Sequence, residues 1–203
     1  LAVSYSTKLA SAVAWKTGAF VSRIGYNFQQ SLYDFNAGLY RNNIINGDGN
    51  TLLWQPYTQL NIKINPKFTF NAGLHVLYLS LNKTRSIEPR ASFQYRIKPN
   101  HSISLAVGQH GKTLPLGSYF YKAPNGSLPN LDLEMMKSTH FVAAYDWLMK
   151  KNWRLHAEVY LQKLSAIPVV NDVNRTFWML NMIDGYANEA LVNSGTGRNK
   201  GVD

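Results

Sequence analysis

The sequence has no cysteine, few charged residues and no long hydrophobic run. Without Cys it can form neither a disulfide nor a thiolate metal site, which fits a reducing compartment or an exported protein that needs no disulfides. Charged residues make up 16%, well below the roughly 25% of an ordinary soluble domain. No apolar run approaches the about 18 residues that mark a transmembrane helix. These absences argue against a disulfide-rich domain, a cysteine zinc site and a membrane-spanning helix.

A targeting signal is also missing. The chain begins Leu1-Ala2-Val3 rather than with Met and a basic segment, so no signal peptide is visible. It ends at Asp203, in what the pattern predicts to be the beginning of a strand. We therefore expect the 203 residues to be an internal part of a longer protein.

Acidic residues are scarce: Asp and Glu number 11 against 21 Lys and Arg, which gives a net charge of +10. Such a balance is typical of nucleic-acid binding when the cations gather on one element. Here they are spread beside predicted short turns, so we expect no nucleic-acid partner. The cations in question are Lys63, Lys67, Arg96, Lys98, Lys150, Lys151 and Arg154.

What the sequence does contain is alternation of apolar and polar residues, as in Thr69–Val76, Ser92–Ile97 and Arg154–Val159. Successive side chains of a strand point to opposite faces, so each segment would form a strand with one apolar and one polar face. Aromatic residues make up 13%, which suits strands and membrane interfaces. The pattern predicts an all-β protein.

Short and long connections alternate along the chain. Tight turns are predicted at residues 16–18, 65–67, 98–100 and 149–152, where Pro and Asn supply turn geometry. The other connections are predicted at Tyr40–Asn50, Asn82–Ser86, Lys112–Met136 and Ser165–Thr196, with room for one helical turn at Leu131–Lys137. Short turns at one end and longer loops at the other are typical of outer-membrane barrels. We predict an antiparallel up-and-down transmembrane β-barrel segment with strands at about 2–15, 19–34, 52–65, 67–81, 87–98, 101–111, 137–149, 153–164 and from about 197.

The alternation also predicts which side chains face lipid. The apolar faces are expected to hold Phe20, Ile24, Tyr26 and Phe28; Leu60, Ile62 and Ile64; Phe93, Tyr95 and Ile97; Ile103, Leu105 and Val107; Phe141, Ala143, Tyr145 and Trp147; and Trp153, Leu155, Ala157, Val159 and Leu161. The polar faces are expected to hold Arg23 and Asn27; Gln59, Asn61 and Lys63; Gln94 and Arg96; Ser104; His140 and Asp146; and Arg154, His156, Glu158 and Gln162. An aromatic girdle is predicted at Trp15, Phe20, Phe68, Trp147 and Trp153. The alternative is a soluble β-barrel or β-sandwich binding module, in which the apolar groups would converge on a closed core.

No catalytic or metal-binding pattern is visible. Cysteine ligands are absent, no two histidines are spaced as zinc ligands, and there is no Gly-x-Ser-x-Gly segment. We therefore predict no enzyme activity, no metal and no cofactor. His75, His140 and His156 fall on polar faces, which predicts that they line the lumen; His101 and His110 are not assigned. In Glu88-Pro89-Arg90, Arg90 could contact a ligand or a plug, but pairing of Glu88 and Arg90 with their neighbours is favoured.

From about Leu52 onward the order of motifs resembles the barrel of TonB-dependent outer-membrane receptors of the Bacteroidetes type. Residues 1–51 match only in pattern. In that family a Gly-Thr-Gly-Arg-Asn-x-Gly-Val stretch leads from an extracellular loop into a strand. The matching segments include Phe68–His75, Leu81–Thr84, Ile87–Tyr95, Pro99–Gly108, His140–Val142, Glu158–Gln162, Ile167–Val169 and Leu191–Val202.

The resemblance implies a barrel of about 22 strands with a plugged lumen. This chain would supply about nine of those strands, while the plug domain, the TonB-contacting segment, the signal peptide and the closing strands would lie outside it. The intact protein would take up a scarce ligand of the siderophore, vitamin, oligosaccharide or peptide class, driven by the TonB energy-coupling complex. Its partners would be outer-membrane lipid and its own plug domain, with room for a surface lipoprotein.

Overall fold

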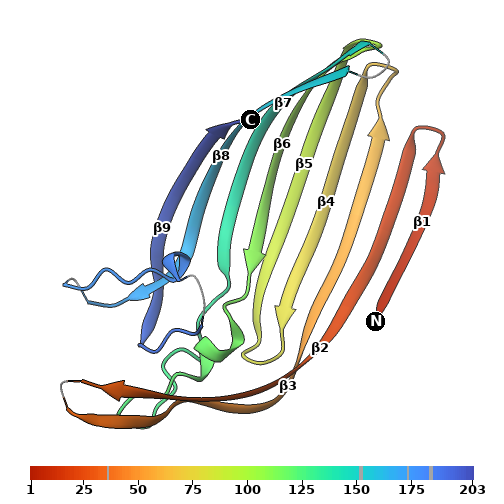
Figure 1. The fold of residues 1–203 in the computed structure, drawn as a ribbon. Coiled ribbons are helices and arrows are strands. Elements are labelled where there is room, and N and C mark those ends of the chain that lie inside the picture. The colour runs from red at the N-terminus through yellow and green to blue at the C-terminus, as the bar shows by residue number, and fades with distance from the viewer. Residues whose placement is uncertain (36, 151–152, 173, 183–184) are drawn as a thin grey trace.

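Nine antiparallel strands form a single curved sheet in the computed structural model (Figure 1), which describes residues 1–35, 37–150, 153–172, 174–182 and 185–203. Each strand pairs with its neighbours in sequence, in the order β1 to β9, and the sheet is not closed. This confirms the predicted all-β, up-and-down architecture. The strands are β1 (Ala2–Ala10), β2 (Val13–Asp34), β3 (Leu39–Lys63), β4 (Phe68–Leu79), β5 (Thr84–Lys98), β6 (His101–Lys112), β7 (Met136–Lys150), β8 (Trp153–Val170) and β9 (Leu191–Val202).

The first short turn was placed wrongly at residues 16–18. The chain turns between Ala10 and Val13, and Gly18 lies inside β2. A Cβ on Gly18 would lie 2.5 Å from the Val3 carbonyl oxygen and 2.8 Å from the Tyr57 hydroxyl. This glycine therefore permits a close approach of neighbouring strands rather than a turn.

The predicted loop at Tyr40–Asn50 is also wrong, because β3 runs through it. Together with β2 it forms a hairpin that extends far beyond the other strands (Figure 1). A Cβ on Gly47 would lie 2.5 Å from the Phe120 ring, so this glycine makes room for an aromatic side chain from a distant loop.

Two of the remaining turns are confirmed, at 64–67 and at 99–100. In the first, the Asn65 side-chain oxygen accepts hydrogen bonds from the backbone N–H groups of Lys67 and Phe68 at 2.9 and 3.0 Å. The turn predicted at 149–152 falls partly on residues 151 and 152, which lie outside the described residues.

The last loop is shorter than the predicted Ser165–Thr196, because β8 continues to Val170 and β9 begins at Leu191. The brief connection before Thr84 is confirmed, and so is the loop from 113 to 135. This loop holds a short helix, η1, at Leu116–Phe120, whereas the helical turn predicted at Leu131–Lys137 is absent from it. A second short helix, η2, spans Met179–Asn181. No helix of the described part of the chain is both long and apolar enough to cross a membrane.

The pairing register confirms the predicted apolar face in β3 and in β5 to β8. Phe93 lies opposite Leu105 and Leu105 opposite Ala143, so their side chains share one face, while Gln94 and Ser104 share the other. These apolar groups do not converge on a closed core: Phe93 is 37% exposed and Leu105 is 55% exposed. The soluble alternative required such a core.

The predicted faces of β2 are inverted. Trp15 lies opposite Leu60, on the apolar face, which also places Arg23 and Asn27 there. Phe20, Ile24, Tyr26 and Phe28 lie on the polar face instead. Phe20 stacks on Tyr57 with a centroid distance of 5.8 Å, so it does not belong to the girdle, whereas Trp15, Phe68, Trp147 and Trp153 lie on the apolar face near short turns.

Candidate functional site

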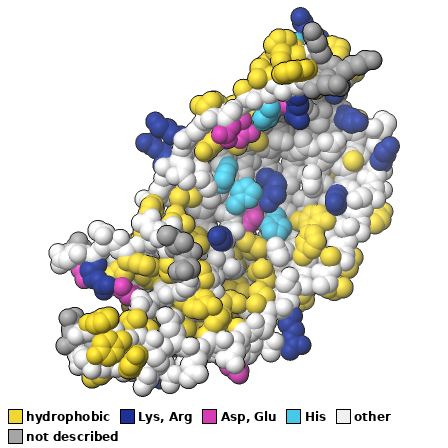
Figure 2. Space-filling view, in the orientation of Figure 1, with side chains coloured by type: hydrophobic (Ala, Val, Ile, Leu, Met, Phe, Trp, Pro, Cys, Tyr) yellow, Lys and Arg dark blue, Asp and Glu magenta, His cyan; other side chains and the backbone are white. Residues whose placement is uncertain are grey.

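The polar face of the sheet is the candidate functional surface, and we call it the inner wall. Figure 2 shows this face hollowed, with side chains of His and of Lys or Arg near its middle. His75, His140 and His156 lie on it as predicted, and so does His110. His101 lies on the opposite face, where its ring stacks on Trp147 and its Nδ1 is 2.6 Å from the Tyr145 hydroxyl.

Glu88 is the centre of the inner wall's most buried polar cluster, with an exposure of 2%. Its Oε2 is 2.8 Å from Nδ1 of His75, the residue directly opposite on β4. Its Oε1 accepts the backbone N–H of Gly111 from β6 at 2.7 Å. Arg90 approaches the same carboxylate at 3.6 Å. These contacts are the neighbour pairing that the sequence favoured for Glu88 and Arg90.

Two glycines leave room for Arg90 on the inner wall. Gly73 and Gly108 occupy the paired positions on the two neighbouring strands. A Cβ on Gly73 would lie 3.2 Å from the Arg90 side chain, and one on Gly108 would lie 3.4 Å from it. The Arg90 side chain remains 47% exposed, so its guanidinium is available to a group inside the hollow.

Arg90, His110 and His140 border an open pocket of about 510 Å³, together with Gln59 and Asn71. The rings of His110 and His140 meet edge to face with centroids 5.0 Å apart. His140 is held by Gln162, whose Nε2 is 3.1 Å from the imidazole Nε2. Donors and acceptors thus line the pocket, which suits a polar ligand or a polar protein surface.

A second polar cluster lies on the inner wall near the short turns. Asp146 accepts hydrogen bonds from Arg154 and lies 3.1 Å from Nδ1 of His156. His156 Nε2 is 3.6 Å from Glu158. Among the described residues, no group of three or more His, Asp or Glu has the geometry to hold a metal ion.

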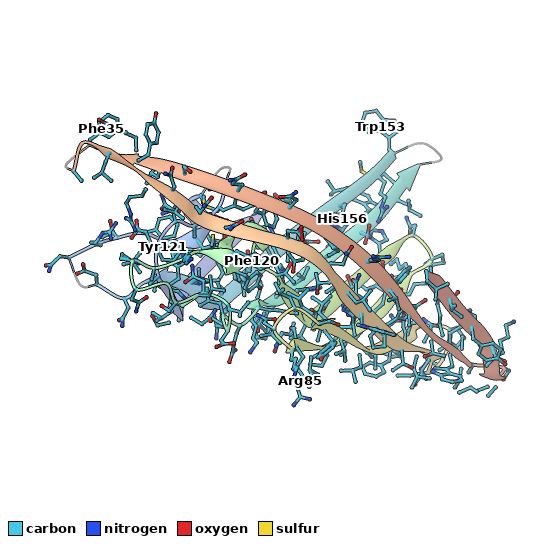
Figure 3. All side chains as sticks on the ribbon, turned by 90° about the horizontal axis from the view of Figure 1, so that it is seen from below. Phe35, Arg85, Phe120, Tyr121, Trp153 and His156 are labelled. Carbon is cyan, nitrogen blue, oxygen red and sulfur yellow. The ribbon has the colours of Figure 1, made fainter. Side chains whose placement is uncertain are left out.

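The connections at the other end of the sheet pack together into what we call the loop cap, formed by the β2–β3 hairpin, residues 113–135 and the described part of residues 171–190. Its core includes Tyr119 and Met135, both fully buried. Ile45 of β3 bridges to Tyr121, and the Lys122 N–H donates to the Ile44 carbonyl at 2.8 Å. Figure 3 shows Phe120 and Tyr121 beside this hairpin.

Asn130 ties the loop cap together from a fully buried position. Its side-chain amide donates to the carbonyls of Ser118 and Glu189 at 3.1 and 2.8 Å, and its oxygen accepts the Leu191 N–H at 2.8 Å. The alternation of apolar and polar residues does not predict this cap. The available signal was the group of apolar and aromatic residues inside segments that looked like polar loops.

Comparisons with known proteins give one family and two similar structures. The family model described as "TonB dependent receptor-like, beta-barrel" matches residues 3–203, and no curated protein sequence matches. The copper transporter OprC has a TM-score of 0.61 and 10% identity, over 82% of this chain and 29% of that chain. A mutant of the ferric enterobactin receptor PfeA from Pseudomonas aeruginosa has a TM-score of 0.66 and 11% identity, over 99% of this chain and 31% of that chain. The chain therefore spans less than a third of either protein, and the likeness concerns the fold.

Proposed function

Since the chain belongs to the TonB-dependent receptor β-barrel family, we propose that it forms one section of a transporter that takes up a scarce ligand. Barrels of this family lie in the outer membrane of Gram-negative bacteria, and this one does too. The matched family and the two similar structures are receptors and transporters rather than enzymes. Residues 1–203 would form part of a single barrel domain of about 22 strands, with β1 and β9 pairing with further strands.

The two unlike faces of the sheet carry this proposal. Apolar side chains such as Leu105 and Phe141 are exposed on one face, as lipid contact requires. The opposite face carries the Glu88 cluster and the histidine pocket. In a closed barrel that face would line the lumen, and we propose that it contacts the protein's own plug domain and the passing ligand.

The ligand classes that fit are siderophores, vitamins, oligosaccharides and peptides. OprC is named as a copper transporter and PfeA as a ferric enterobactin receptor, so we propose that ligands containing a metal ion are tested first. We propose TonB as the energy-coupling partner, with outer-membrane lipid around the barrel and a surface lipoprotein as a further partner over the loop cap.

Uptake can be tested in a strain whose gene for the intact protein is deleted. We expect the deletion to abolish energised uptake of one radiolabelled member of a panel containing ferric siderophores, cobalamin, oligosaccharides and peptides, and the intact gene to restore it. Removing TonB should have the same effect as deleting the receptor. Unchanged uptake of every compound in both strains would contradict the proposed transport function.

A further inference from the structure

Cations occupy the apolar face of the sheet at its loop end. Arg23, Arg85, Lys163 and Arg198 are exposed there, and Lys137 lies on the same face with Glu134 as its ion-pair partner. Figure 3 shows Arg85 projecting away from the ribbon. In the described parts of β4 to β9 no Asp or Glu occupies this face, because the acids of these strands point to the inner wall. Those acids are Glu88, Asp146 and Glu158.

Lys163, Lys137 and Arg85 each lie one membrane crossing away from an aromatic residue on the same face of their own strand. On β8, Trp153 and Lys163 are ten residues apart (163 − 153) and share a face. The same separation joins Trp147 to Lys137 on β7 (147 − 137) and Tyr95 to Arg85 on β5 (95 − 85). A tilted membrane strand needs about 9–11 residues to cross the hydrocarbon. Aromatic residues therefore mark the interface near the short turns, and cations mark the loop-end interface, where Tyr78 also lies opposite Arg85.

The register shows that the cations follow a line across the tilted strands. Lys163 pairs with Thr139, and Thr139 pairs with Gln109. Since Gly108 pairs with Arg90, Gln109 is level with residue 89, and Arg85 lies four residues farther toward the loops (89 − 85). Strands of a barrel are staggered in this manner, so cations on different strands reach the same depth in the membrane.

Directly below these cations the apolar face is hollowed. A depression of about 670 Å³ is lined almost entirely by apolar groups, including Phe93, Leu105, Phe141 and Leu161, with small Ala143 between them. The Lys163 ammonium lies 5.8 Å from the centre of the Phe141 ring, at the edge of this depression. Lys163 pairs directly with Arg198 of β9. Within the described structure, neither cation has an acidic partner within 4.0 Å.

We propose that Lys163, Arg198 and the adjoining depression form a site for a phosphate-bearing lipid of the outer leaflet. The two cations would bind the headgroup phosphate, which a guanidinium recognises through paired N–H donors. The depression beside Phe141 would hold an acyl chain. This site rests on the outer-membrane barrel, but it lies on the opposite face from the inner wall and is independent of the transported ligand.

The test uses the intact protein purified in detergent and titrated with bis-phosphorylated lipid A, with its dephosphorylated form as the reference. We expect Lys163→Gln combined with Arg198→Gln to lower the lipid affinity about tenfold, since each cation near a membrane surface attracts anionic lipid. Lys163→Arg should retain binding. The matched control, Lys16→Gln with Lys112→Gln, removes two exposed cations from the inner wall and should have no effect.

A second variant, Ala143→Phe, fills the depression without changing charge and should weaken binding of the same lipid. Equal affinity for the two lipid A forms with the unaltered protein would overturn the proposal, and so would an equal loss in the inner-wall control. If inorganic phosphate binds equally well and Ala143→Phe has no effect, the site takes free phosphate rather than lipid. Ligand uptake is measured separately in cells, so failure of the transport function leaves this result intact.

Discussion

Glu88 is a buried acid on which groups from three strands converge: His75 of β4, Arg90 of its own strand and the Gly111 N–H of β6. Charged residues are almost never fully buried unless they are paired. The carboxylate therefore holds three strands of the inner wall in register, and Pro89 beside it gives up no inner-wall contact because its ring lies on the apolar face.

Glu88→Ala should destabilise the intact protein by about 1–3 kcal/mol, because it leaves the Gly111 N–H and the His75 imidazole without their partner. Glu88→Gln keeps an acceptor oxygen and should cost less. The free energy of unfolding in urea, measured in detergent micelles, checks this order. Glu134→Gln is the control, because the Glu134 side chain is 60% exposed. A loss no greater for Glu88→Ala than for this control would refute the structural role of Glu88.

The buried Tyr119 should make the stability of the loop cap depend on pH in alkaline solution. Burial raises the pKa of its phenol, although the hydrogen bond from the Leu114 N–H opposes the rise. A group whose pKa is raised by folding stabilises the fold fully below its unfolded pKa, which for Tyr is about 10, and loses that contribution as the pH rises through the folded pKa. Protease resistance of residues 113–135 should therefore fall in strongly alkaline solution. In Tyr119→Phe this additional alkaline loss should disappear, and an identical pH profile in both proteins would contradict the prediction.

At the scale of single elements, the sequence predicts strands well where each face has one environment. From β4 to β8 one face is apolar and the other is polar, as expected for a barrel wall between lipid and lumen, so alternation identifies both faces. In β2 it fails because the inner face enters the loop cap, where Tyr26 packs on Phe120 and Phe28 on Tyr186, each at 4.9 Å. Because these aromatic residues alternate with polar ones, the sequence pattern of β2 is the same as that of a strand whose aromatic face contacts lipid.

The glycines of the first hairpins misled the prediction for a related reason. Gly18 and Gly47 suggested turns or loops, but each makes space for an aromatic side chain, Tyr57 and Phe120 respectively. Which partner fills that space depends on strand register and on contacts far apart in the sequence, so local pattern could not identify it.

The hydrogen bonds of Asn130 should make the segments of the loop cap unfold together, as one cooperative element. Asn130→Ala removes hydrogen bonds to Ser118, Glu189 and Leu191 and leaves buried backbone groups unpaired, at a cost of about 1–3 kcal/mol for each such group. We expect protease added to intact cells to cleave all three cap segments faster in this variant. Asn125→Ala is the matched control, since Asn125 is exposed and bonds only within its own turn. Faster cleavage confined to residues 113–135 would show that the cap is not cooperative.

At the scale of the molecule, the sequence predicted the strand number, the places of the two longest connections and the family. It could not predict the inner-wall clusters. Glu88 and Gly111 are 23 residues apart and meet only through the register of β5 and β6. In the proposed transporter the choice of ligand would depend on how the whole inner wall and the plug meet, which would be a property of the closed barrel.

The isolated 203-residue chain should not behave as a soluble monomer. Its sheet ends in two unpaired edges, at β1 and β9, and open strand edges promote association. Its apolar face also exposes Leu105, Phe141 and Val159, a surface that lipid would cover in a barrel. We expect the expressed chain to sediment without detergent and to elute as a micelle-bound species with it. The intact protein, whose barrel would have no edges, should remain dispersed in the same detergent without higher oligomers. A monodisperse monomer of the 203-residue chain in detergent-free sizing would contradict the assignment of this face to lipid.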